Sequence, residues 1–392
     1  MKIKGFKFSG ISANIKKNGR KDLGLICGEG PLSVAGVFTS SSIKAAPVVL
    51  DIERIKGGSA RAVIVNSGNA NACTGEAGMR DAIATSSFLA AELGALEEEV
   101  LVSSTGVIGQ RLPVEKINAA IPELVAALDY DNVQDFAEAI MTTDSYPKMH
   151  SVTSKINGKD VSITGVAKGA GMISPNMATM LSYVMTDAAI NSKMLAHALK
   201  VATDVSFNSI TVDGDMSTND TVIALASGAS GADIVEGETG HLEFISMLKE
   251  LMIELAKMIV RDGEGATKLI ELKVKGADSK EDAKKAAVKI ANSPLVKTAF
   301  YGEDANWGRI VAALGGTDIK LDEAKLDIWF DDVCIVKDGL FKGVEAEEEA
   351  TERMKNKEIS LTVNINMGPH EATLWTCDLT HDYIKINAEY RS

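Results

Sequence analysis

Histidine and cysteine are scarce in this sequence, and they are never spaced as metal ligands. Five histidines and four cysteines are spread over 392 residues. Neither a His-x-x-x-His pair nor a Cys-x-x-Cys pair occurs, although zinc sites commonly use such closely spaced ligands. We therefore expect no metal ion and no cofactor, and we expect the cysteines to be reduced thiols.

Long apolar runs and an excess of basic charge are also missing. No stretch approaches the ~18 consecutive apolar residues of a membrane-spanning helix. The first residues, Met1–Phe6, lack the apolar core of a secretory signal. The formal net charge is −13, which argues against nucleic acid as a partner because phosphate binding needs a basic face. The sequence thus predicts a cytoplasmic protein that binds neither a membrane nor nucleic acid.

The chain is long enough for two or three domains, and its composition shifts near residue 270. There Ile270–Lys275 alternates apolar and charged residues, as a strand with one solvated face does. We expect a larger unit over 1–269 and a smaller α+β unit over 270–392. Periodicity predicts helices at 77–93, 113–128, 131–141, 192–204, 242–261 and 279–291, and strands at 47–50, 62–65, 100–106, 161–166, 179–186, 326–337, 359–366 and 371–386, with a further strand from Asn208.

The stretch Val166–Asp187 carries the most specific signal because its character changes halfway. The first half has a Gly-Ala-Gly run and Pro175, which favour a loop, and the second half is apolar from Thr179 on, as in a buried strand. Thr179 can be an ordinary strand start. It can also be a nucleophile, if cleavage after Ala178 frees its α-amine as a base. An α-amine has a pKa of ~7.7–8.0, so part of it is neutral at pH 7.

Two other places combine residue types that catalysis uses. Thr105 and Gly106 end a predicted strand, where a hydroxyl and a backbone N–H can form an oxyanion hole. Glu264 lies between two glycines, so a ligand ammonium could approach its carboxylate closely. The ordinary alternatives are a Thr-Gly turn and an exposed loop charge.

Two binding motifs can be rejected. The Gly-Ala-Gly run lacks the third glycine of a dinucleotide fingerprint, and no Gly-Lys-Ser/Thr follows it. The acidic loop Asp213–Asp220 has its glycine misplaced for an EF-hand and lacks the closing glutamate. We therefore expect neither a nucleotide-phosphate loop nor a calcium loop.

The segment Lys168–Met180 resembles the cleavage segment of the glutamate N-acetyltransferase (ornithine acetyltransferase) family of arginine biosynthesis. The resemblance covers almost the whole chain. It includes Asn66–Ala72, the acidic loop Asp213–Asp220, Tyr301–Arg309 and the tail Ile386–Ser392. It implies an α/β (α+β) fold in which layered sheets flanked by helices form a self-processing catalytic core over 1–269, followed by a smaller α+β domain whose tail returns to the active site.

The resemblance also implies roles for single residues. The chain would cut itself between Ala178 and Thr179 and use Thr179 as the nucleophile. Thr105 and Gly106 would form the oxyanion hole. The substrate-binding residues would be Thr142, Lys168, Thr179, Glu264, Asn387 and Ser392. The last residue is serine where the family has threonine, which retains the hydroxyl.

The implied reaction moves an acetyl group from N2-acetyl-ornithine to glutamate through an acetyl-threonine, with acetyl-CoA as a further donor in bifunctional members. The two fragments would stay associated, with two copies of each. One alternative is an N-terminal-threonine amidohydrolase or aminopeptidase of related fold, in which water takes the acyl group. The other is a binding protein that never cleaves itself.

Overall fold

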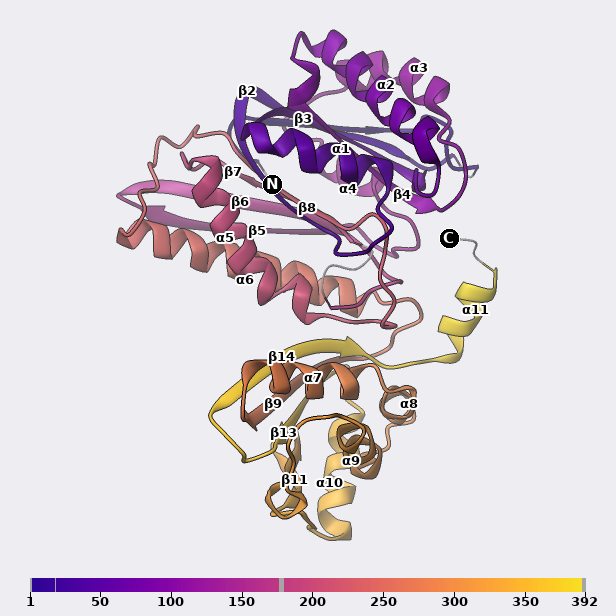
Figure 1. Ribbon diagram of the computed structural model, residues 1–392, viewed down its shortest axis with the longest axis vertical. Helices are drawn as coiled ribbons and strands as arrows, with labels where there is room; N and C mark the ends of the chain where they lie inside the picture. Colours follow the sequence, from indigo (N-terminus) through magenta and orange to yellow (C-terminus); the bar gives the residue numbers. More distant parts are fainter. Residues whose placement is uncertain (1, 18, 176–179, 390–392) are drawn as a thin grey trace.

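The computed structural model describes residues 2–17, 19–175 and 180–389. The predicted cleavage bond between Ala178 and Thr179 and the predicted site residue Ser392 lie outside these ranges. Figure 1 shows a larger upper part and a smaller lower part, which follow one another along the chain.

The strands of the described residues form two sheets. Those of the first are β1 (Phe6–Ile11), β2 (Leu23–Phe38), β3 (Ser59–Asn69), β4 (Val100–Val107), β5 (Lys148–Ile156), β6 (Lys159–Lys168), β7 (Leu181–Thr186) and β8 (Thr221–Ala226). Their order is β4-β3-β2-β8-β7-β6-β5, with β1 paired to β2. The β3–β4 and β7–β8 pairs are parallel, and the other neighbours are antiparallel.

The long strand β2 divides the first sheet into two stacked layers. Its first half pairs mainly with β3, its second half pairs with β8, and the register shifts between Cys27 and Leu32. The side chains between the two layers form one buried cluster, in which Val63 of β3 packs with Tyr183 of β7 and Ile223 of β8. Since side chains alternate between the faces of a strand, the residues next to these in each strand point to the outer face of the layer, where helices pack.

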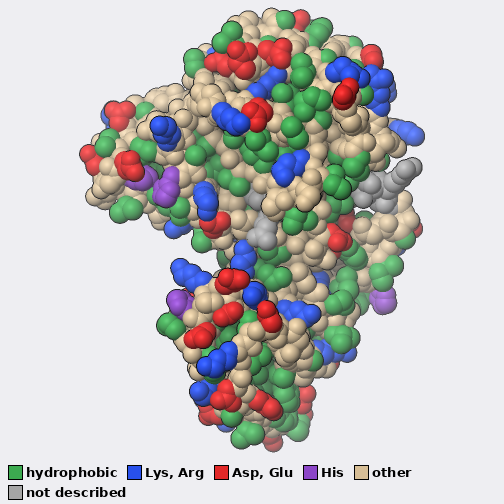
Figure 2. All heavy atoms as spheres, in the orientation of Figure 1, with side chains coloured by type: hydrophobic (Ala, Val, Ile, Leu, Met, Phe, Trp, Pro, Cys, Tyr) green, Lys and Arg blue, Asp and Glu red, His purple; other side chains and the backbone are tan. Residues whose placement is uncertain are grey.

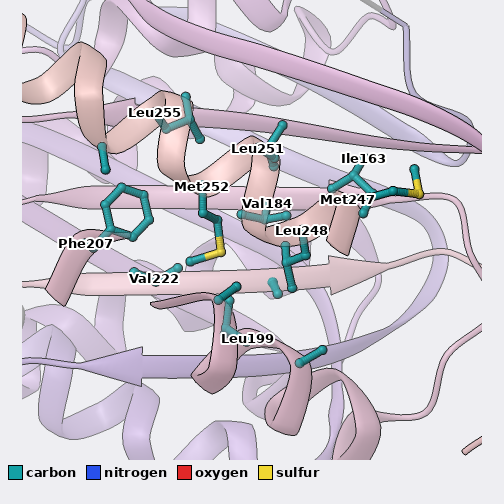
Figure 3. Close-up of a cluster of buried hydrophobic side chains, with 14 of the residues drawn as sticks. Ile163, Val184, Leu199, Phe207, Val222, Met247, Leu248, Leu251, Met252 and Leu255 are labelled. Carbon is teal, nitrogen blue, oxygen red and sulfur yellow. The ribbon is translucent and has the colours of Figure 1, made fainter. Parts of the chain in front are cut away.

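Helices cover the two outer faces of these layers. On one side α2 (Gly75–Leu93) and α3 (Val114–Ala126) pack on the β2–β4 half. On the other side α5 (Ser192–Asp204) and α6 (Thr239–Arg261) pack on the β5–β8 half. Figure 3 shows Leu248, Leu251 and Leu255 of α6 against Ile163 and Val184 of the strands. Helices α1 (Ala46–Arg54) and α4 (Val133–Ala139) complete this part.

The second sheet follows in the chain and has its own apolar core. Its strands are β9 (Leu269–Ala277), β10 (Asp327–Phe330), β11 (Val333–Lys337), β12 (Leu340–Phe341), β13 (Glu358–Asn364) and β14 (His370–Cys377), in the order β12-β11-β10-β13-β9-β14. The helices are α7 (Lys280–Ala291), α8 (Pro294–Tyr301), α9 (Trp307–Gly315) and α10 (Val344–Met354). The predicted boundary at 269/270 falls inside β9, and the division into domains stays a prediction.

Three predicted elements are wrong. The chain forms α1 where a strand was expected at 47–50, because Pro47, the second residue of the helix, is tolerated in the first turn of a helix. From Asn208 there is a short 3₁₀ turn, Phe207–Ser209, and one isolated bridge at Ile210 instead of a strand. The expected strand 371–386 ends at Cys377, and α11 (His381–Glu389) follows. The Thr380 hydroxyl accepts the N–H of Tyr383 at 3.4 Å, as a helix cap does.

Among the described residues, no helix is long and apolar enough to cross a membrane. On the face shown in Figure 2, acidic and basic side chains are interspersed.

Candidate active site

A cavity of about 240 Å³ lies where the ends of β4 and β6 meet α11. Six of the residues predicted for the site line it: Thr105, Gly106, Thr142, Lys168, Glu264 and Asn387. Its remaining lining residues are Ile108, Thr143, Gly171, Met172, Asp213, Asp215, Ser217, Asn219 and Tyr383. The structure thus brings together residues that are up to 282 positions apart in the chain.

Thr105 and Gly106 lie at the end of β4, beside the parallel strand β3. The backbone requires glycine at 106, since its φ is +131° and a Cβ there would lie 2.4 Å from the carbonyl carbon of Gly68. The Thr105 Oγ1 accepts a hydrogen bond from Lys168 Nζ at 3.3 Å. Because the Thr105 oxygen is the acceptor in this bond, its own O–H is left to donate to an oxygen in the cavity.

Lys168 is the last residue of β6, and its side chain is buried although it lines the cavity. Burial lowers the pKa of the Lys168 ammonium, and the neighbouring Lys148 lowers it further, whereas Asp144, Asp220 and Glu264 act in the opposite direction. Among the described residues, its Nζ donates a hydrogen bond to Thr105. An incompletely paired buried cation is a suitable partner for the carboxylate of a ligand.

A buried group of charges behind the cavity holds the segments that carry Thr142 and Lys168. Asp144 accepts the N–H of Thr142 at 2.9 Å and the N–H of Gly169 at 2.7 Å. Lys148 Nζ lies 2.7 Å from Asp144 and 2.6 Å from Asp262 at the end of α6. The nearby Lys148 and Lys168 hold the pKa of Asp144 below its ordinary value despite burial, which opposes them, and the two carboxylates raise that of Lys148. Asp144 and Lys148 are therefore both charged, and together with the side chain of Asp262 they fix this wall of the cavity.

Glu264 lines the cavity together with Tyr383 and Asn387 of α11. Asn387 Nδ2 donates to Glu264 Oε2 at 2.8 Å, and the backbone N–H of Glu264 donates to Ala170 O at 2.8 Å. Gly171 permits this approach, because a Cβ on it would lie 2.4 Å from the Glu264 carboxylate. The cavity therefore holds an ammonium, that of Lys168, and a carboxylate, that of Glu264.

Tyr383 is a cavity residue that the sequence analysis missed. Tyr383 lines the cavity one turn before Asn387 and donates to Asp213 Oδ2 at 3.3 Å. The i, i+4 spacing of Tyr383 and Asn387 would have placed both on one helix face, but only if residues 381–389 had been predicted as a helix. The asparagine-rich segment Asn66–Ala72, which begins in β3, does not line the cavity. Its amides bond to backbone instead, as Asn66 does to Asn69 O.

The described residues contain no group of three His, Cys, Asp or Glu side chains placed to hold a metal ion. A small polar cavity lined by a buried lysine, three acidic residues and a Thr-Gly pair, within a layered α/β fold, is the arrangement of an enzyme that acts on a small charged molecule.

Comparison with known proteins identifies the family. The family described as the ArgJ family matches residues 7–392. The arginine biosynthesis bifunctional protein ArgJ of Geobacter sulfurreducens is 54% identical over 395 residues, covering 100% of each chain. The protein of the same name from Syntrophotalea carbinolica is 49% identical over 393 residues, again covering 100% of each. A crystal structure of the arginine biosynthesis bifunctional protein ArgJ from Bacillus halodurans is 43% identical with a TM-score of 0.52, and the match covers 54% of this chain and 100% of the solved one.

The chain belongs to the ArgJ family. The predicted family, an acetyltransferase of arginine biosynthesis, is thereby confirmed, and so is the predicted α/β fold of layered sheets flanked by helices.

Proposed function

We propose that this enzyme transfers the acetyl group of N2-acetyl-ornithine to glutamate, with Thr179 as the nucleophile. One observation carries the assignment of the site. The two residues predicted for the oxyanion hole and four of those predicted to bind substrate line one cavity. Met180, which follows Thr179 in the chain, is buried, and its N–H donates a hydrogen bond to Asp220. Asp220 lies directly before β8.

The first step is processing. The Thr179 hydroxyl attacks the carbonyl of Ala178, the acyl group moves from nitrogen to oxygen, and water hydrolyses the ester. The products are a carboxylate on Ala178 and a free amine on Thr179. The fragments have 178 and 214 residues, the latter being 392 less 178. The share of this chain matched by the whole solved chain from Bacillus halodurans, 54%, supports this division, because the 214-residue fragment would be about 55% of the chain.

In the transfer, the Thr179 hydroxyl attacks the acetamide carbonyl and its proton passes to the α-amine. The oxyanion accepts hydrogen bonds from the Thr105 hydroxyl and the Gly106 N–H. The carbon–nitrogen bond breaks, and ornithine leaves with the proton from the ammonium. The glutamate amine then attacks the acetyl ester, and the Thr179 oxygen regains a proton as N-acetyl-glutamate leaves.

The charges of the cavity match both substrates. Each carries an α-carboxylate, which Lys168 can pair with, while the side-chain ammonium of acetyl-ornithine fits Glu264. Thr142 and Asn387 offer a hydroxyl and an amide at the same cavity. We assign Ser392 a substrate contact from the resemblance alone.

The test is to incubate the enzyme with acetyl-ornithine, with and without glutamate, and to quantify acetate and acetyl-glutamate. We expect acetyl-glutamate with glutamate present and little acetate without it. Acetate formed equally fast in both reactions, with no acetyl-glutamate, would make the protein a hydrolase. Thr179→Ala should remain one uncut, inactive chain.

The relatives are named bifunctional, and we therefore include acetyl-CoA as a second acetyl donor. Acetyl-glutamate formed from acetyl-CoA and glutamate alone would support this extension. Association of the fragments as two copies of each and a cytoplasmic location remain predictions from the sequence.

A further inference from the structure

The buried carboxyl group of Asp220 has no role in the mechanism above. Asp220 ends the acidic loop directly before β8, and its side chain is fully buried. Oδ1 accepts the N–H of Met180 at 2.9 Å. Oδ2 is buried as well and has no hydrogen-bond partner among the residues that the structure describes. A buried polar atom without a partner is costly, and such atoms in native proteins often have a functional reason.

Chain connectivity places Asp220 close to the amine that cleavage would release. The nitrogen of Thr179 is three bonds from that of Met180, so the two atoms are within about 4 Å of each other in any conformation. Since Met180 N lies 2.9 Å from Oδ1, the α-amine of Thr179 is no more than about 7 Å from this carboxyl group. Thr221 N–H donates to Met180 O at 3.1 Å, so both ends of the Met180 residue are held against the start of β8.

The surroundings of Asp220 favour a charge change on cleavage. Burial raises the pKa of Asp220 to about 8, although the Met180 N–H, the Thr39 hydroxyl and the Lys168 ammonium act against this rise. Lys168 on β6 is the charged group that faces it, and Asp144 and Glu264 face Lys168 in turn. Before cleavage no α-ammonium exists, and the carboxyl group retains its proton over much of the neutral range. A new ammonium beside it would favour the carboxylate.

Resting on the proposed function, we propose that Asp220 is the positioning residue of the nucleophile, and that Oδ2 accepts a hydrogen bond from the Thr179 α-amine after cleavage. The proton of the Thr179 hydroxyl passes to the α-amine, and Asp220 stabilises the resulting ammonium without taking the proton. The ammonium then gives the proton to the leaving ornithine amine. Asp220 thus acts on the α-amine as the aspartate of a Ser-His-Asp triad acts on its histidine.

The test compares Asp220→Asn with wild type over a range of pH. Asparagine retains an oxygen for the Met180 N–H but loses the carboxylate. The α-amine pKa should fall by about one unit or more, so the acidic limb of the kcat/KM profile moves to lower pH, and kcat falls roughly 10- to 100-fold. Self-cleavage should persist, because the free α-amine of Thr179 forms only when the chain is cut. Asp220→Glu retains the charge and should leave the limb in place.

Asp51→Asn is the matched control. Asp51 is also buried, its pKa is also raised by burial, and it accepts the backbone N–H of Val102 at 3.0 Å. It does not line the cavity, and its variant should retain the wild-type profile. A wild-type profile in Asp220→Asn, an equal shift in Asp220→Glu, or an uncut but folded Asp220→Asn would each overturn the proposal.

A second measurement needs no variant. Cyanate carbamoylates neutral amines, and the modified N-terminal peptide of the 214-residue fragment can be quantified by mass after digestion. A carboxylate partner should hold the Thr179 amine protonated to pH ~8 or above. A lower pKa of the Thr179 amine in the wild type would mean that the carboxylate partner is missing, and this result would overturn the proposal. If the wild type makes no acetyl-glutamate, the proposed function fails, whereas an unshifted amine in an active enzyme refutes only the role of Asp220.

Discussion

Replacing Lys148 by methionine tests the charge group behind the cavity. Lys148 Nζ is 2.7 Å from Asp144 Oδ1 and 2.6 Å from Asp262 Oδ2, with side-chain exposures of 0%, 0% and 5% for the three residues. Without the lysine, two carboxylate oxygens remain no more than about 5.3 Å apart. At an effective dielectric constant of ~20 their repulsion is about 3 kcal/mol, in line with the ~3–5 kcal/mol lost when a buried ion pair loses one partner.

We expect Lys148→Met to lower the free energy of unfolding by about 3–5 kcal/mol at pH 7 and the thermal midpoint by roughly 6 to 20 °C. The pH dependence has a definite sign. Since the pKa of folded Asp144 is depressed, its stabilising contribution is complete above the ordinary aspartate pKa of ~3.9 and is lost as the pH falls toward the folded value. The gap between wild type and variant should therefore narrow below pH ~4.

Far-UV circular dichroism against temperature, at pH 7 and at pH 3.5, measures this. Lys200→Met is the control, since Lys200 pairs with Asp204 at the surface with exposures of 74% and 53%, and its loss should cost under ~1 kcal/mol. The kcat/KM of Lys148→Met should also fall at least about tenfold, because Asp144 holds the backbone of Thr142 and Gly169. A cost below ~1 kcal/mol with unchanged kcat/KM would refute the role given to this group.

Three more predictions concern single side chains. Thr105→Ala should lower kcat about 100-fold with little change in KM, since an oxyanion donor acts mainly in the transition state; a normal kcat with weaker binding would assign Thr105 to the ground state. Glu264→Gln should raise the KM for acetyl-ornithine about 10- to 100-fold and leave that for glutamate nearly unchanged; equal effects on both would show that Glu264 does not contact the ornithine ammonium. In uncut Thr179→Ala, the raised Asp220 pKa of about 8 should make stability fall as the pH rises from ~4 to ~8. Adding Asp220→Asn should flatten this slope in urea unfolding, and an unchanged slope would place its origin elsewhere.

Long periodic elements could be predicted from the sequence, and short ones could not. The helix expected at 242–261 is α6, Thr239–Arg261, because its apolar residues recur with the helical period over many turns. The nine-residue helices α1 and α11 offer too few turns for that signal. Missing α11 also hid Tyr383, which reaches the cavity only from a helix.

The site itself depended on the resemblance for its residue roles and on the structure for its geometry. No local pattern marks Lys148 as buried, since lysine is usually exposed. It becomes buried because Asp144 and the distant Asp262 converge on it. The unpaired oxygen of Asp220 is likewise visible only once β7 and β8 are side by side.

The intact mass of the purified protein tests the central claim most directly, before and after incubation with acetyl-ornithine alone. The account predicts two fragments, residues 1–178 and 179–392, and one added acetyl group on the second fragment only. A single uncut chain of 392 residues that is fully active, or an acetyl group on any residue other than Thr179, would contradict it.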